Sequence, residues 1–156
     1  MAMSDLKALM NSHERATLKE FYQKGEVGPP MWLIEDEDGN RVLVATALDS
    51  SEEMAKAARE SIKGLHAVRY AFVMEAWFIT HKEGAGLDNM RPSQNPLRRE
   101  GVYFSAEDKD GNRLVRQYEI HRRQGAKPWL EKMDVGDDPY AVTGRFVDMF
   151  SEGPYT

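Results

Sequence analysis

The chain has 156 residues, of which 41% are hydrophobic and 30% are charged, and it carries a formal net charge of −5 and no cysteine. This length and composition suit one globular domain with a buried core. The absence of cysteine excludes disulfides, thiolate catalysis and cysteine-ligated metal centres, and the acidic net charge argues against non-specific binding to nucleic acid.

The first residues of the sequence carry no targeting pattern. Met1-Ala2-Met3-Ser4-Asp5 lacks the charged, apolar and small-residue layout of a signal peptide. No apolar run approaches the roughly 20 residues that a membrane helix needs. We therefore expect a cytoplasmic protein without membrane contact, folded as a single domain over residues 1–156.

Residues 4–24 are predicted to form a helix. Ser4 is a natural N-cap residue, Gly25 supplies a stop, and Pro29-Pro30 prevents the helix from restarting. His13 lies on the apolar stripe, where a partly buried structural role is more common than a functional one. The stripe recurs near helical spacing at Leu6, Leu9, Met10, either Ala16 or Thr17, and Phe21.

Residues 31–46 are predicted to form a β-hairpin. Two apolar runs, 31–34 and 41–46, flank an acidic turn at 35–40 that contains Asp38-Gly39. Glycine accepts the positive φ that short hairpin loops require. The acidic cluster also invites a calcium interpretation, but its spacing lacks the glycine and the final acidic residue of an EF-hand loop, so we favour the turn.

A second helix is predicted over residues 51–63. Ser50 and Glu53 have the spacing of a capping box, and Gly64 is placed to act as a left-handed C-terminal cap. Its apolar face is expected to pack on a sheet through Met54, Ala58, Ile62 and Leu65.

Residues 68–80 form the most β-prone segment. Both alternating faces are largely apolar, which predicts a central strand covered on two sides, with Phe72 in the core. Glu75 is the exception. Because an unpaired carboxylate is costly to bury, we expect it to be partly buried and bonded to an arginine. The candidate partners are Arg98, Arg99, Arg113 and Arg116.

The C-terminal half is predicted to contain a loop at 84–96 and a second hairpin formed by residues 101–106 and 113–123. The turn at 107–113 repeats the sequence at 35–41 except at its third position. Duplication is one explanation, and the same turn solution used twice is the simpler one. Residues 129–133 are read as a short helical turn. Residues 141–150 are read as a final strand, with a helix as the alternative over 139–150.

These elements predict an α+β fold. It consists of an antiparallel sheet of five to six strands, with two hairpins and a long central strand, and two main helices. Parallel nucleotide-binding sheets are disfavoured because β and α elements do not alternate.

Standard catalytic and phosphate-binding motifs are mostly absent from the sequence, and two constellations of residues remain as candidates. If Glu75, His81, Glu119 and His121 share a sheet face, two carboxylates and two imidazoles could hold a divalent metal or perform acid–base chemistry. The alternative is a solvated or ion-paired sheet face.

Arg91, Arg98 and Arg99, together with Trp77, are weak candidates for binding. Arginine forks suit carboxylate or phosphate groups, but we favour the interpretation that these arginines offset nearby acids. Glu75-Ala76-Trp77, Arg91-Pro92-Ser93 and Arg98-Arg99-Glu100 resemble segments of uncharacterised bacterial and phage proteins. That resemblance covers the middle third of the chain and implies no activity.

We therefore expect a small non-enzymatic binding protein of bacterial or phage type that acts through a protein surface. Trp32, Trp129 and Tyr140 are the expected exposed apolar residues. A protein partner and a homo-oligomer are both compatible with the sequence, and no cofactor or metal centre is predicted. The alternative is a small metal-dependent hydrolase or nuclease, for which the four Glu and His side chains would have to converge in a pocket.

Overall fold

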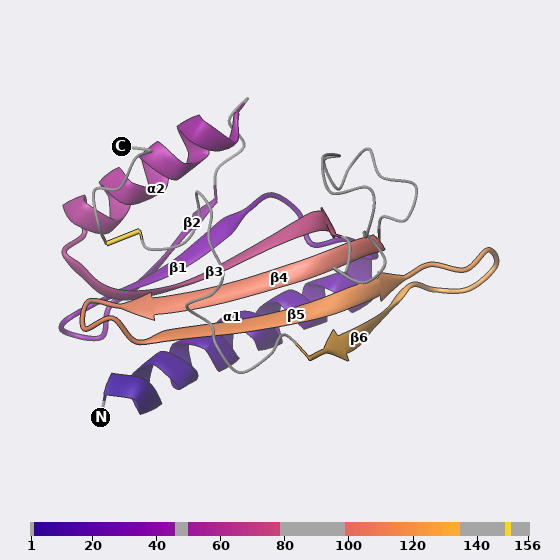
Figure 1. Ribbon diagram of the computed structural model, residues 1–156, viewed down its shortest axis with the longest axis horizontal. Helices are drawn as coiled ribbons and strands as arrows, with labels where there is room; N and C mark the ends of the chain where they lie inside the picture. Colours follow the sequence, from indigo (N-terminus) through magenta and orange to yellow (C-terminus); the bar gives the residue numbers. More distant parts are fainter. Residues whose placement is uncertain (1, 46–49, 79–98, 135–148, 151–156) are drawn as a thin grey trace, which may run out of the picture.

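The computed structural model describes residues 2–45, 50–78, 99–134 and 149–150. Two helices, α1 (Ala2–Lys24) and α2 (Ser51–Gly64), pack on a six-stranded antiparallel sheet of order β2-β1-β3-β4-β5-β6 (Figure 1). This architecture confirms the predicted α+β class. The strands are β1 (Met31–Asp36), β2 (Arg41–Ala45), β3 (Ala67–Phe78), β4 (Arg99–Asp108), β5 (Arg113–His121) and β6 (Trp129–Met133).

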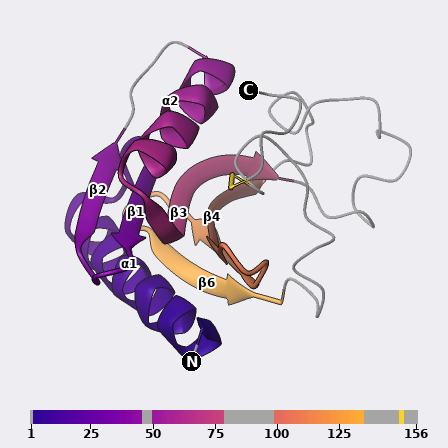
Figure 2. The same ribbon diagram turned by 90° about the vertical axis from the view of Figure 1, so that its left-hand side faces the viewer.

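β3 lies inside the sheet, between β1 and β4, and its alternation divides the core into two layers. Ala71 and Val73 join the cluster that packs against α1, whereas Tyr70 and Phe72 join the cluster that packs against α2. The two helices therefore cover opposite faces of a strongly curved sheet (Figure 2). We call these the α1 face and the α2 face. The prediction of a central strand covered on both sides is confirmed.

α1 begins earlier than predicted. Its first residue is Ala2, so Ser4 lies within the helix and does not cap it. Alanine and methionine are good helix formers, which lets the helix extend beyond Ser4. His13 is buried as expected, and its Nε2 lies 3.3 Å from the Met31 carbonyl oxygen. The buried apolar stripe of α1 consists of Leu6, Leu9, Met10 and Phe21.

The two hairpin turns have the same hydrogen-bond geometry. Asp36 Oδ1 accepts the N–H groups two and four residues further on, both at 2.9 Å. Asp108 Oδ1 accepts the equivalent N–H groups at 3.0 and 2.9 Å. Gly39 and Gly111 have φ values of 83° and 88°, which favour glycine. The repeated sequence therefore encodes one turn solution in two places.

The C-terminal end of α2 differs from the prediction, although its beginning does not. The Glu53 N–H donates to Ser50 Oγ at 3.1 Å, as the capping box requires. Gly64 remains within the helix, and the positive φ, 53°, falls on His66. The left-handed position therefore comes two residues later than predicted, after a Leu65 cap whose N–H donates to the Ser61 carbonyl.

β6 corrects the reading of residues 129–133 as a helical turn. This segment pairs with β5 in antiparallel register, with Trp129 opposite His121. Five residues are too few to sustain a helix alone, whereas pairing supplies a backbone ladder. Residues 149–150 form a turn, not the end of a strand. The rest of the predicted strand at 141–150, and the loop at 84–96, lie outside the described residues.

Within the described residues, neither helix combines the length and apolarity that crossing a membrane requires.

Candidate functional site

Glu75 lies on the opposite face of the sheet from Glu119 and His121. Glu75 is paired with Val102 of β4, whose side chain belongs to the core beneath α1. Glu119 is paired with Gly101, the preceding residue of β4. Because neighbouring strand residues point to opposite faces, Glu119 and His121 project from the α2 face and Glu75 from the α1 face. The sheet therefore separates the carboxylates that the sequence analysis grouped together.

On the α2 face, Glu119 is held by an arginine. Arg99 Nε donates to Glu119 Oε2 at 2.8 Å, and Arg99 Nη2 donates to the other carboxylate oxygen. These bonds hold the pKa of Glu119 below its usual range, because they stabilise the ionised carboxylate. The His121 ring stacks on Trp129, with centroids 5.1 Å apart and planes at 18°.

Three potential metal ligands lie at this end of the α2 face. One ligand atom each from Glu119, His121 and Glu131 lies within 4.8 Å of the others. Divalent transition metals accept such donors. However, the Arg99 guanidinium already bonds both oxygens of Glu119, and its charge opposes a cation there. The geometry fits an ion-paired sheet surface better than a metal centre.

On the α1 face, Glu75 is bonded to the backbone. Its Oε1 accepts the Val27 N–H at 3.1 Å, just beyond the end of α1. Partial burial raises the pKa of Glu75 above its usual range. Glu75 also lines a small cavity of about 220 Å³ together with Trp77 and Glu100. The prediction that Glu75 is partly buried is correct, and within the described residues its hydrogen-bond partner is the Val27 amide.

The described arginines expected beside Glu75 bond other carboxylates, so that part of the prediction is wrong. Arg99 and Arg113 lie on the α2 face, away from Glu75, because they pair with Phe78 and Glu107. Arg116 shares the α1 face with Glu75, but it bonds Glu14 of α1. Arg98, Arg91 and His81 lie outside the described residues. The observed pairs are Arg99 with Glu119, Arg113 with Glu107 at 3.1 Å, and Arg116 with Glu14 at 3.3 Å.

The three aromatic residues expected on the surface have different positions. Trp32 is fully buried because it faces α2 from an inner strand, and its ring lies tilted against that of Phe72, with centroids 4.6 Å apart. Trp129 is exposed, as predicted, and Tyr140 lies outside the described residues. Trp77 is 41% exposed, but it lies on the α1 face, away from Arg99.

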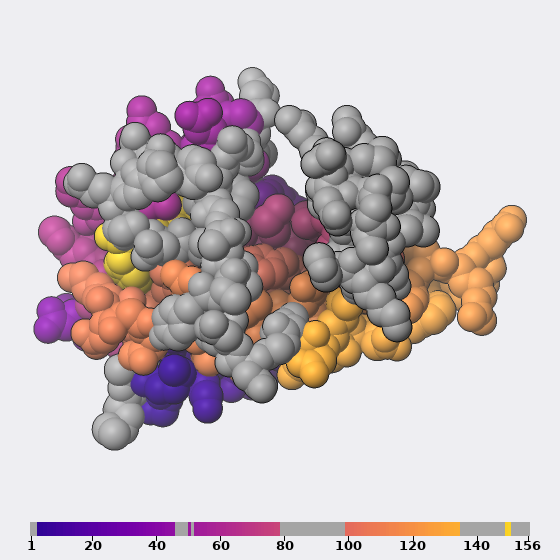
Figure 3. Space-filling model, in the orientation of Figure 1, coloured from indigo at the N-terminus to yellow at the C-terminus, as the bar shows by residue number. Residues whose placement is uncertain are grey.

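A second cavity lined by described residues was not anticipated by the sequence analysis. It has a volume of about 600 Å³, within the usual size range of ligand pockets. It lies between α2, the β4–β5 turn and residues 149–150. Figure 3 shows residues 149–150 as yellow atoms between α2 and the β4–β5 turn. We call it the α2 pocket. Its lining residues are Lys56, Arg59, Glu60, Ile62, Lys63, His66, Ala67, Lys109, Met149 and Phe150.

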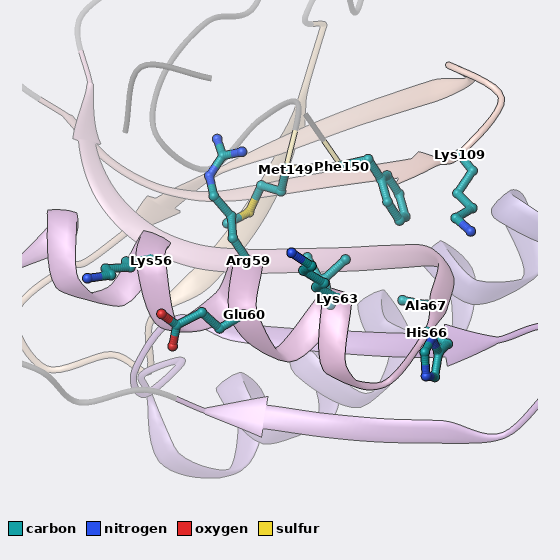
Figure 4. A pocket seen from close by; sticks show the side chains of 10 residues that line it. Lys56, Arg59, Glu60, Lys63, His66, Ala67, Lys109, Met149 and Phe150 are labelled. Carbon is teal, nitrogen blue, oxygen red and sulfur yellow. The ribbon is translucent and has the colours of Figure 1, made fainter. Parts of the chain in front are cut away.

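The α2 pocket combines cationic walls with an apolar floor. Among the described residues, four lysine and arginine side chains line it with a single carboxylate, that of Glu60, in a chain of net charge −5. Figure 4 shows Arg59 rising from α2 beside Met149, and Lys109 entering from the β4–β5 turn near Phe150. A ligand that carries both negative charge and apolar surface fits this lining.

Residues of β1 and β3 hold Met149 and Phe150 in position. Trp32 Nε1 donates to Met149 Sδ at 3.2 Å, and the Met149 N–H donates to the Tyr70 hydroxyl at 3.4 Å. The Tyr70 ring lies 5.5 Å from that of Phe150. The apolar floor of the α2 pocket is thus anchored to β1 and β3. The pocket combines segments up to 94 residues apart (Lys56 to Phe150), so no local sequence motif predicts it.

Comparison with protein family models, curated proteins and solved structures found no match for this chain.

Proposed function

We propose that this chain is a non-enzymatic binding protein, and that its α2 pocket binds an acidic segment of a partner protein. In this proposal, carboxylates of the partner lie along Lys63 and Lys109, and one apolar side chain of the partner packs on Met149 and Phe150. The observation that carries the proposal is the excess of cations around an apolar floor on an otherwise acidic molecule.

The electrostatics favour a short acidic peptide over nucleic acid. Like-charge repulsion from a protein of net charge −5 disfavours a long polyphosphate, whereas a local cationic patch still attracts a few carboxylates. Arg59 is largely buried and extends along the pocket wall, so its guanidinium is held close to the position a ligand would occupy. Ordered cations of this kind favour specific recognition, because less side-chain entropy is lost on binding.

The placement of the sequence-predicted acids supports binding over catalysis. A hydrolase that uses Glu75 with Glu119 and His121 would need these groups around one substrate, but they lie on opposite sheet faces. The Arg99 fork on Glu119 also removes the most buried of the candidate carboxylates from metal binding.

Calorimetric titration of the full chain tests the proposal. The probe is a synthetic twelve-residue peptide of glutamate and phenylalanine, and the comparison peptide replaces every glutamate with lysine. We expect the acidic peptide to bind with micromolar affinity that falls as salt increases, and the basic peptide not to bind. Lys63→Glu and Lys109→Glu should each weaken binding about 5–10-fold, since each replaces an attraction with a repulsion.

Lys19→Glu is the matched control. Lys19 is exposed on α1, across the sheet from the α2 pocket, and the same charge change there should leave the peptide affinity unchanged. If Lys19→Glu and Lys63→Glu weakened peptide binding equally, net charge alone would explain the loss, and the assigned site would be refuted. Failure of the acidic peptide to bind at millimolar concentration, or tighter binding of random duplex DNA than of the peptide, would refute the assigned partner.

A further inference from the structure

β2 forms one edge of the described sheet, and its residues 42–45 carry none of the charges or prolines that usually protect an edge strand. Within the part of the chain that the structure describes, β2 pairs with β1 alone. Exposed edges normally carry charges, prolines or bulges that prevent pairing with another chain. Residues 42–45 of β2 contain no charged residue and no proline, and Val42 and Leu43 are 42% and 56% exposed.

The single charge on β2 is directed inward. Arg41 Nε donates to Glu35 Oε2 at 2.6 Å, and its Nη1 donates to Ser12 Oγ at 3.3 Å. The guanidinium therefore links β2 to β1 and α1, and it does not shield the outer edge of β2.

The opposite edge of the sheet is protected. β6 carries Glu131 and Lys132, and its Leu130 N–H donates to the Tyr22 hydroxyl of α1 at 3.2 Å. Charged side chains and a hydrogen bond to Tyr22 thus protect the β6 edge from pairing with another strand. This contrast singles out β2 as the edge that is available for pairing.

The backbone register shows which groups β2 presents outward. The Asp36 N–H donates to the Asn40 carbonyl at 3.0 Å, which makes this an inward-facing pair. Since antiparallel ladders alternate, residues 42 and 44 also bond inward to β1. The N–H and C=O groups of Arg41, Leu43 and Ala45 therefore point away from the sheet.

We propose that two copies of this chain associate through antiparallel pairing of their β2 strands, with a two-fold axis at Leu43. In this register Leu43 lies opposite Leu43 of the partner subunit, and the outward groups of Arg41 meet those of Ala45 of the partner subunit. Val42 lies opposite Val44 of the partner subunit. The outward-bonding residues on each strand coincide, as an isologous contact requires.

The sequence of β2 is complementary to itself in antiparallel pairing, so we take a second copy of this chain as the partner of the edge. Two-fold pairing brings apolar side chains together on both faces and sets the only charged residue opposite a small neutral one, so no like charges meet. The contact lies on β1–β2, apart from the lining of the α2 pocket, and it does not depend on the proposed function.

Sedimentation equilibrium of the full chain from 1 to 300 μM tests this inference. We expect the dimer mass at the upper concentrations and the monomer mass throughout for Leu43→Lys, which would place two ammonium groups opposite each other. Leu65→Lys, at another exposed leucine, should retain the dimer. A monomer at 300 μM, or a dimer that persists in Leu43→Lys, would overturn the proposal.

Amide hydrogen exchange on the unaltered chain provides a readout that needs no variant. The outward Leu43 N–H should become protected as the protein concentration rises, whereas the inward Val42 and Val44 amides should be protected at all concentrations. Exchange at Leu43 that does not depend on concentration would contradict β2 pairing even if the chain dimerises by another surface.

Discussion

Glu75 and Glu119 are paired with adjacent residues of β4, Val102 and Gly101, and therefore leave the sheet on opposite faces. Each carboxylate consequently has its own environment. Burial raises the pKa of Glu75, and hydrogen bonds from Arg99 lower that of Glu119. The two groups thus make opposite contributions to the pH dependence of folding, and each contribution is measurable.

Glu119 should stabilise the fold at neutral pH and lose this effect in acid. A folded-state pKa below the unfolded value of about 4.5 means that the contribution is complete above pH 4.5 and disappears as pH falls through the folded value. Glu119→Gln should cost about 1–3 kcal/mol at pH 7, because Arg99 loses its charged acceptor. Urea titrations from pH 2 to 7 measure this, with Glu131→Gln, on the facing residue of β6, as the control.

Phe72→Ala should destabilise the fold by about 3–5 kcal/mol, because it opens a cavity in the core beneath α2. Phe72 is fully buried, and its ring packs at a tilt against that of Trp32. Leu65→Ala, which truncates a partly exposed side chain, should cost about 1 kcal/mol or less. A loss below about 1 kcal/mol for Phe72→Ala in a denaturant titration would be incompatible with this packing.

Gly64→Ala should leave stability unchanged or raise it by about 0.4–1 kcal/mol. Gly64 lies in α2, does not have a positive φ, and has open space where a Cβ would be added. His66 occupies the left-handed position, so His66→Gly should stabilise and His66→Val should destabilise. Thermal unfolding of the three variants tests the assignment. If Gly64 were the left-handed cap, Gly64→Ala would destabilise the fold.

The sequence predicted what local patterns determine. The alternation in β3, the capping box at Ser50 and the turn glycines Gly39 and Gly111 each depend on neighbours within a few residues, and all three are present in the structure. β6 was missed because Leu130, Glu131, Lys132 and Met133 are good helix formers, and only pairing with β5 overrides that preference.

The site could not be predicted because it depends on register and on distant segments. Which β4 residue faces Glu75 is set by strand pairing, and shifting that pairing by one residue would reverse every face assignment. The α2 pocket needs Lys109 and Phe150 to meet the end of α2, although each is an unremarkable residue in its own segment.

The pairing of Glu75 with a backbone amide leads to a prediction opposite to that for Glu119. Glu75→Gln should be neutral or stabilising at pH 7, because the amide oxygen still accepts the Val27 N–H and no charge remains to be buried. A folded-state pKa above the unfolded value means that the Glu75 contribution is complete below pH 4.5 and is lost as pH rises through the folded value. Glu75→Gln should therefore flatten the stability profile above pH 4.5.

Glu75→Leu separates the hydrogen bond from the charge. It removes the acceptor of the Val27 N–H and should cost about 1–3 kcal/mol at pH 4, because Val27 is buried and its amide would be left unsatisfied. The cost should shrink at pH 8, where the native Glu75 contribution is lost. Glu26→Gln, at the exposed residue just before Val27, controls for the general loss of an acid in this region. Unfolding free energies measured in urea at pH 4, 6 and 8 distinguish the variants. A marked loss of stability in Glu75→Gln at pH 7 would show instead that the ionised carboxylate itself stabilises the fold.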